Sequence, residues 1–414
     1  MKPYSLSLYS GVLDAGQTFV TSLTHAAADW RRSIAAIGGY AEGVLSLSGD
    51  VQGAFDGWLG YHLVERCGGT TTWEGMITEL ELEIAGMRRI RSLELMANAV
   101  RATYIALTWQ PGGGFVWQTR WTTWATNSHS IGTYGRREQV LQLDACPKAT
   151  AEAKRDTTLS TYAYPWTRPQ GVPELQWSGR AIGSERSESR SASGVGTPAP
   201  TRLIVRAAGY GATAGWMFAQ EGDNLDHDVS HWIAAIVGSA FSLSANHGGS
   251  AAGAGDCQFL RSGVIDRNTL QVTECTTTPQ RAGDLLYSLA ALGDSTGYPW
   301  SLEVDTGRLV HYRPVDRTPR YYLKGAQVFD NLTAHTPAPP WTLRPAVMRD
   351  MSYRPAVRSE PGSFLDDPRD IYVEEVEVAA SGGVSLRTSL FDQSDLLANQ
   401  FDYLEPWTPR WRRR

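Results

Sequence analysis

The sequence has little cysteine and no long apolar run. Its four cysteines, none closer to another than 18 positions in 414 residues, exclude a disulfide framework and a paired-cysteine metal or redox motif. No run of 18 apolar residues occurs, so we expect no stable membrane insertion. Residues 1–8 alternate polar and apolar side chains, a pattern that is not typical of a secretory signal peptide.

Lysine is also scarce, and the basic charge is carried almost wholly by arginine. Only Lys2, Lys148, Lys154 and Lys324 are lysine, against 34 arginines. A GC-rich genome explains this bias, and so do arginine-rich interfaces, where the planar guanidinium pairs well at buried contacts. The net charge of −5 argues against a general nucleic-acid binder.

Tryptophan, glycine and proline are abundant. The chain has 15 Trp, 41 Gly and 21 Pro. Many turns and many large aromatic side chains indicate a β-rich protein with wide contact surfaces, which would bind carbohydrate or other subunits.

Period-two alternation predicts strands over Tyr4–Ser10, Gly43–Asp50 and Thr72–Ile84. Helix-forming patterns occur at Ala151–Tyr162, Ser230–Ala240 and Ala282–Leu292. The order of elements predicts an α+β, β-rich fold. We expect a first domain over 1–145, a helix and linker over 146–200, and a second domain over 201–414, with 217–300 as an α/β insertion.

Three glutamates share one face of the clearest predicted strand. Glu79, Glu81 and Glu83 alternate with Leu80 and Leu82, so that the carboxylates point one way and the leucines the other. A solvated strand face, a paired-carboxylate glycosidase site and the negatively charged wall of a channel all fit this pattern.

The metal-like cluster of the sequence is His227, Asp228 and His231. Two histidines four positions apart share a helix face, as in two-histidine zinc sites, but no glutamate general base stands between them. Asp226, Asp228 and Ser230 directly precede an apolar helical run, where short polar side chains cap free N–H groups. Capping is therefore our prediction, with metal binding as the weaker alternative.

Two common sequence motifs of enzymes are absent. The sequence has no phosphate-binding P-loop and no nucleophile elbow. We therefore predict no catalytic residues, no cofactor and no enzymatic activity, and composition points to assembly.

Several segments together resemble the baseplate hub, or tail-tip, proteins of tailed bacteriophages. They are Trp73–Ile77 with Arg91–Val100, then Asn127–Glu138 with its Ser-Ile-x-x-Tyr-Gly-Arg segment, then Leu203–Trp216, and last Leu292–Pro314. The resemblance covers about residues 70–315 and is carried by the order and spacing of these segments.

The resemblance implies two tube-like β-barrel domains with helical insertions, and a homotrimer that adapts a six-fold tail tube to a three-fold tip in the virion. It implies as partners a distal tail or tube protein, a tip or fibre protein and the tape-measure protein, with DNA passing through without specific binding. In such a ring, Glu79, Glu81 and Glu83 would face the lumen. The candidates for subunit interfaces are Trp73, Trp117, Trp121, Trp124, Tyr134 and Arg136.

Two other functions remain open from the residues. The abundant tryptophan equally fits a carbohydrate-active enzyme or glycan-binding module, which would place exposed tryptophans around a cleft with two acids. Another ring-forming virion protein, such as a distal-tail or connector protein, would form a six-fold or twelve-fold ring.

Overall fold

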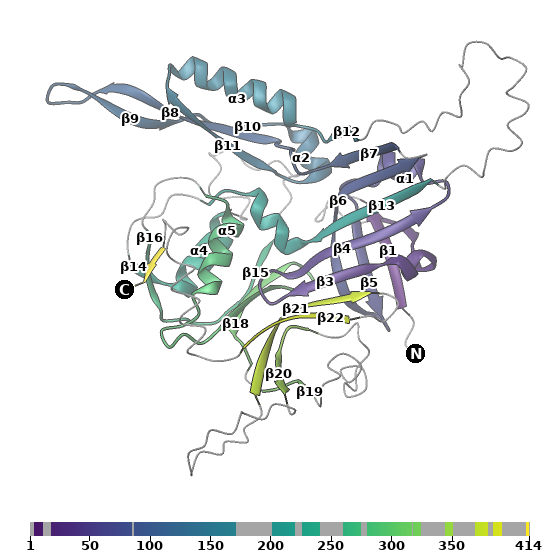
Figure 1. Ribbon diagram of the computed structural model, residues 1–414. Helices are drawn as coiled ribbons and strands as arrows, with labels where there is room; N and C mark the ends of the chain where they lie inside the picture. The colour runs from purple at the N-terminus through teal and green to yellow at the C-terminus, as the bar shows by residue number, and fades with distance from the viewer. Residues whose placement is uncertain are drawn as a thin grey trace, which may run out of the picture.

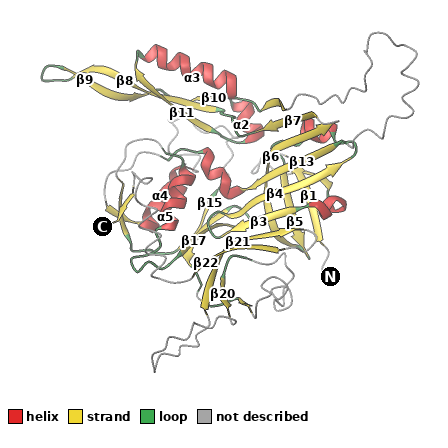
Figure 2. Cartoon of the chain, in the orientation of Figure 1, coloured by secondary structure: helices red, strands yellow, loops and turns green. Residues whose placement is uncertain are grey.

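The computed structural model describes residues 4–10, 18–84, 87–170, 201–219, 226–240, 260–274, 280–316, 318–323, 344–350, 369–379, 384–390 and 411–413. Figure 1 shows a body built around one large sheet, with a long hairpin and helix projecting from it. Strands dominate and the helices lie in separate groups, as Figure 2 shows. The predicted α+β, β-rich class is confirmed.

The large sheet has thirteen strands. Ten follow in the order β19-β20-β21-β3-β4-β13-β6-β5-β1-β2, while β7 lies beside β6, β12 beside β7 and β22 beside β21. Their bounds are β1 Tyr4–Ser10, β2 Thr18–Ser22, β3 Arg31–Ala35, β4 Gly39–Ser48, β5 His62–Cys67, β6 Thr70–Ile84, β7 Met87–Ser92, β12 Trp166–Gln170, β13 Arg202–Gly209, β19 Tyr321–Leu323, β20 Val347–Asp350, β21 Arg369–Ala379 and β22 Val384–Leu390. Two short helices, η1 Thr24–Asp29 and α1 Gln52–Gly57, join its N-terminal strands.

Strands from distant parts of the chain complete this sheet. β13 is antiparallel to both β4 and β6, and β21 is antiparallel to β3. Both β13 and β21 belong by sequence to the predicted second domain, 201–414. The division at residues 145 and 200 therefore does not separate two sheets, because the local alternation that predicted each strand carries no information on its distant partner.

Large apolar side chains pack on the buried face of the large sheet. Leu6, Leu8, Leu45 and Leu80 are fully buried, and the rings of Trp30 and Trp73 meet edge to face at 5.1 Å between centroids. Two glycines allow neighbouring groups to approach the backbone closely. A Cβ on Gly43 would meet both tryptophan rings, and one on Gly209 would overlap the Tyr40 carbonyl.

The projecting part forms a second sheet, which we call the arm. It contains β8 Ala99–Trp109, β9 Phe115–Trp121, β10 Ala125–Thr126 and β11 Glu138–Ala145, with helices α2 Ser128–Tyr134 and α3 Lys148–Tyr162. α3 covers one face through Ala151, which packs against Ala102 and Tyr104. In Figure 1 the β8–β9 tip extends beyond α3, away from the body.

Glu138 and Arg137 of the arm contact the body. The carboxylate of Glu138 accepts a 2.9 Å hydrogen bond from the Phe218 N–H. The guanidinium of Arg137 stacks on the Trp216 ring at 3.4 Å and donates to the Leu93 carbonyl at 2.8 Å. Burial away from water lowers the pKa of Arg137 well below its ordinary value.

The remaining elements pack beside the large sheet. They are η4 Tyr210–Trp216, α4 Val229–Ala240, α5 Ala282–Ala291, a sheet of β15 Arg261–Ile265, β18 Leu309–Pro314 and β17 Trp300–Val304, and a sheet of β14 Asp226–Asp228, β16 Gln271–Glu274 and β23 Trp411–Arg413. Their apolar side chains join the same core as the large sheet. β15 lies within the predicted insertion 217–300, but its partner β18 lies beyond it.

Barrel closure is not confirmed. Among the described strands, the pairings of each sheet end in edges, so none of the sheets closes on itself. No helix in the described ranges is both long and apolar enough to span a membrane.

Candidate functional site: a charged sheet face

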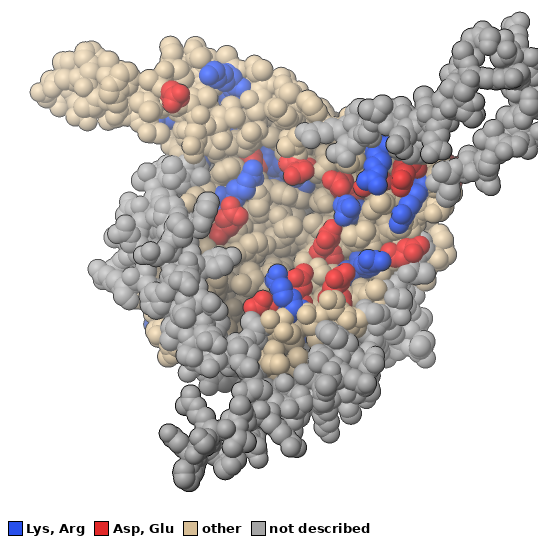
Figure 3. Space-filling view, viewed as in Figure 1, with Lys and Arg blue, Asp and Glu red and all other residues tan. Residues whose placement is uncertain are grey.

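One face of the large sheet carries rows of charge that change sign from strand to strand. The rows run from acidic β21 to basic β3, acidic β4, basic β13, acidic β6 and basic β7. The side chains are Glu375 and Glu377, Arg31, Glu42, Arg202 and Arg206, Glu79, Glu81 and Glu83, and Arg88. We call this surface the charged face. Figure 3 shows red and blue side chains alternating across it.

Cross-strand ion pairs connect these rows. The Arg206 guanidinium lies 3.2 Å from a Glu79 carboxylate oxygen on β6 and 3.5 Å from Glu42 on β4. Arg88 lies 3.2 Å from Glu81. Opposite charges facing each other across strands stabilise a sheet modestly, and pairs as exposed as Arg206–Glu42 contribute little.

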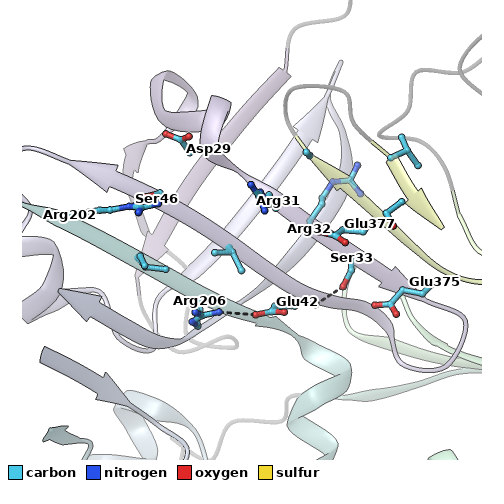
Figure 4. Close-up of a pocket in the computed structure, with 15 residues that line it drawn as sticks. Asp29, Arg31, Arg32, Ser33, Glu42, Ser46, Arg202, Arg206, Glu375 and Glu377 are labelled. Carbon is cyan, nitrogen blue, oxygen red and sulfur yellow. Dashed lines mark hydrogen bonds and ion pairs between the residues drawn. The ribbon is translucent and has the colours of Figure 1, made fainter. Parts of the chain in front are cut away.

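The charged face is hollowed between β13 and β21. The hollow has a volume of about 780 Å³, and its lining includes Arg31, Ser33, Glu42, Arg202 and Glu377. In Figure 4 these side chains come from four neighbouring strands, and dashed lines join Arg206 to Glu42 and Glu42 to Ser33. Among the described residues that line this hollow, none is aromatic.

The predicted face of β6 exists. Leu80 and Leu82 are fully buried on one face, and Glu79, Glu81 and Glu83 lie on the opposite face. Glu81 is itself buried there, while Glu79 and Glu83 are half-buried. These glutamates do not form a purely negative surface, because Arg202 and Arg206 of β13 lie on one side of them and Arg88 of β7 lies on the other. Burial raises the pKa of Glu79, the nearby Arg206 lowers it, and Glu81 raises it further. Whether these glutamates face a lumen stays a prediction.

Sequence reasoning missed the arginine rows. Arg202, Ile204 and Arg206 alternate with the buried Leu203 and Val205. This alternation was visible in the sequence, but its meaning depends on β13 lying between β4 and β6. That placement brings its arginines beside the glutamates of both neighbours.

Two interface candidates are corrected by their burial. Trp73 is completely buried against Trp30 and Tyr40, so it stabilises the interior of this chain. Arg136 is 7% exposed, and its Nε donates to the Glu138 carboxylate at 2.8 Å. Neither side chain is presented to a neighbouring subunit.

The other candidates lie on or near the arm. The Arg101 guanidinium stacks over Trp121 at 3.9 Å and over Trp124 at 4.8 Å, so both rings already have contacts within the chain. Tyr134 is half-buried and packs against Gly60, and burial raises its pKa. Trp117 is 64% exposed, which keeps it available for contact.

The His227–Asp228–His231 cluster is a helix cap. The Asp228 carboxylate accepts hydrogen bonds from the Ser230 hydroxyl at 2.6 Å and from the His231 N–H at 2.7 Å, at the start of α4. The His227 and His231 rings stack at 4.1 Å. Within the described ranges, no three His, Cys, Asp or Glu side chains group as metal ligands would. The prediction of capping is confirmed for Asp228, whereas Ser230 lies inside α4 and donates its hydroxyl to Asp228.

Comparison with known proteins gives one similar structure. No protein-family model and no curated protein matches the sequence. The chain is similar to the crystal structure of the tail protein from Neisseria meningitidis MC58, with a TM-score of 0.38 and 6% sequence identity over 93% of this chain and 96% of that one. An identity and a TM-score this low do not by themselves assign a function to this chain.

Proposed function

We propose that this chain is a structural component of a phage tail tip, a trimeric baseplate hub that joins a six-fold tail tube to a three-fold tip. The proposal rests on the charged face. It is a broad sheet surface with a hollow of about 780 Å³, and the described residues that line it carry charges of both signs and include no aromatic side chain. In the ring, this face lines the channel, and sheets of neighbouring copies complete the tube that the described strands of one chain leave open.

Charge balance suits such a wall. DNA binds surfaces on which basic groups accumulate, because its affinity comes largely from released counterions. On the charged face, basic side chains such as Arg206 pair with acidic ones such as Glu79, so no continuous basic surface faces the DNA phosphates. DNA passes along a wall of this kind without being held. The role is structural, without catalysis or cofactor, and a distal tail or tube protein, a tip or fibre protein and the tape-measure protein are the neighbours.

The placement of tryptophan favours this role over a carbohydrate cleft. The exposed Trp109 and Trp117 lie on the projecting arm and the exposed Trp166 on β12, while the described residues that line the hollow of the charged face include no aromatic side chain. A carbohydrate-active cleft needs exposed aromatic rings and a pair of acidic side chains in the same place, because the rings stack on the sugar while the acids act on it.

Subunit number tests the proposal. Native mass spectrometry and class-averaged electron micrographs of the purified chain should show a trimer with a central opening, and antibody labelling should place it at the tail tip of virions. A six-fold or twelve-fold ring would instead support a distal-tail or connector protein. A monomer that binds glycans would overturn the proposal in favour of a carbohydrate-active module.

A further inference from the structure

A cavity lies where the arm joins the body. It has a volume of about 330 Å³, and its lining includes Leu93, Arg137 and Trp216. It adjoins the hollow of the charged face, with which it shares Glu42 and Arg206. We call it the joint cavity. Its volume falls within the range of pockets that hold small ligands.

Arg137 forms part of the wall of the joint cavity and is only 4% exposed. Two neighbours in the same wall hold its guanidinium. The Trp216 ring stacks on it at 3.4 Å, and the Leu93 carbonyl accepts a 2.8 Å hydrogen bond from Nη1. The Nε–H and Nη2–H groups have no hydrogen-bond partner among the described residues. These two donors share one edge of the guanidinium, where they point the same way.

Within the described ranges, no carboxylate pairs with this buried cation. Glu42 and Glu79 line the same cavity but pair with Arg206. Burial lowers the pKa of Arg137, and the positive charge of Arg281 lowers it further. A buried charge without a counter-ion destabilises a fold, and a paired anion offsets that cost. The chain therefore holds a guanidinium that lacks only an anion.

The chemistry of the cavity selects the kind of anion. Two parallel N–H donors match the two oxygens of a carboxylate, and they match a phosphate equally well. The lining also includes Glu42, Glu79 and Glu94. These carboxylates repel a doubly charged phosphate more strongly than a singly charged carboxylate, because the repulsion grows with the charge of the ligand. A carboxylate is therefore the better fit.

We infer that Arg137 binds a carboxylate group, which enters the joint cavity on a free acid or on an acidic side chain of another protein. Both donor groups are enclosed by the chain, so the carboxylate reaches them as the half-buried Trp216 ring moves aside. Arg137 belongs to the arm and Trp216 to the body, so an occupied site changes the contact between the two. The inference does not depend on the proposed function.

Thermal melting of the full-length chain tests this site. The protein is melted in sodium acetate, sodium chloride and sodium phosphate at equal ionic strength. It is also melted with a capped Ala-Glu-Ala peptide and with its Ala-Gln-Ala counterpart, which has no carboxylate. At an acetate concentration about tenfold above the dissociation constant, the melting temperature should rise by about 1–2 °C over its value in chloride.

Three variants assign the response to Arg137. Arg137→Met removes the donors and should abolish the difference between acetate and chloride. Arg137→Lys keeps the charge but has no pair of parallel donors, so it should bind acetate about tenfold more weakly or worse. The matched control is Arg101→Met. Arg101 also lies on the arm and stacks on a tryptophan, Trp121 at 3.9 Å, but it is not among the residues that line the cavity. This control should respond like the wild type.

The ligands separate the two sources of the carboxylate. Stabilisation by the glutamate peptide but not by the glutamine peptide supports the site and assigns it to an acidic side chain. Stabilisation by acetate alone supports the site and assigns it to a free acid. Equal melting temperatures in acetate and chloride, or an acetate effect that persists in Arg137→Met, overturn the inference. Phosphate that stabilises the wild type more than acetate overturns the carboxylate as the ligand.

Discussion

Arg32 and Glu65 form an ion pair inside the large sheet, where their side chains are only 1% and 2% exposed. Arg32 lies between Arg31 and Ser33 on β3. Its side chain is buried and points toward β5, away from the charged face. Two charges removed from water stabilise each other only while both are present.

Removing one partner of this pair should therefore be costly. We expect Arg32→Met to lower the free energy of unfolding by about 3–5 kcal/mol, because the Glu65 carboxylate is left buried alone. Replacing both residues, Arg32→Met with Glu65→Leu, should recover most of this loss. Urea unfolding followed by circular dichroism measures both variants, and a single variant as stable as the wild type would show that the pair is not needed.

The three glutamates of β6 should matter little for assembly. Glu79→Gln, Glu81→Gln and Glu83→Gln together should leave the subunit number unchanged and change the unfolding free energy by about 1 kcal/mol or less. Glu81 is buried, but the arginines that pair with Glu79 and Glu81 are 41% and 54% exposed, so water screens both ion pairs. Leu80→Ala on the opposite face of the same strand is the comparison, with an expected loss of about 2–5 kcal/mol. Dissociation of the ring in the triple variant would mean that these carboxylates hold subunits together.

Glu74 should make stability depend on pH. Its carboxylate accepts a 2.9 Å hydrogen bond from the Gly307 N–H, which joins β6 to the turn between β17 and β18. Burial raises the pKa of Glu74, while the Gly307 hydrogen bond and the charge of Arg308 lower it by less. The folded pKa therefore lies above the unfolded one. The contribution of Glu74 to stability is full below the unfolded pKa and is lost as pH rises through the folded pKa.

The variant Glu74→Gln isolates this effect, because glutamine keeps the acceptor oxygen and does not titrate. The stability of Glu74→Gln relative to the wild type should increase as the pH rises above the ordinary pKa of a glutamate. Urea unfolding at several pH values measures the difference. A difference that stays constant or falls with rising pH would contradict the raised pKa.

Asp228 should act on α4 through its hydrogen bonds and not through a metal. We expect Asp228→Ala to cost about 1 kcal/mol, the usual loss for an N-cap, and Asp228→Asn to keep most of the stability. Thermal melting with and without zinc completes the test. A melting temperature that rises with zinc in the wild type but not in His231→Ala would instead support a metal site.

The local elements of this fold were predictable. Alternation predicted β1 with the bounds that it has in the structure and most of β6, and helix-forming patterns predicted α3, α4 and α5 to within a few residues. These patterns are local, since one apolar face of a strand or helix must be buried wherever the partner comes from. The capping role of Asp228 was predictable for the same reason, because the cap and its N–H groups are neighbours in sequence.

The charged face was not predictable beyond β6. It depends on pairings between β6 and β13 and between β3 and β21, whose residues are separated by more than a hundred positions. Trp73 shows the same difficulty in the core. The high tryptophan content of the chain suggested that Trp73 lies at a subunit interface. Its burial depends on contacts with Trp30 and Tyr40, which lie on other strands or loops and cannot be read from the local sequence.

The position of β13 also determines when the large sheet can complete its folding during synthesis on the ribosome. β4 and β6 are synthesised long before Arg202–Gly209, the strand that joins them. Until that strand emerges, the nascent chain carries two open edges with hydrophobic faces, which are prone to pair with other chains. A product truncated before residue 202 should thus aggregate, and cells that make this protein need to shield the growing sheet until its middle strand arrives.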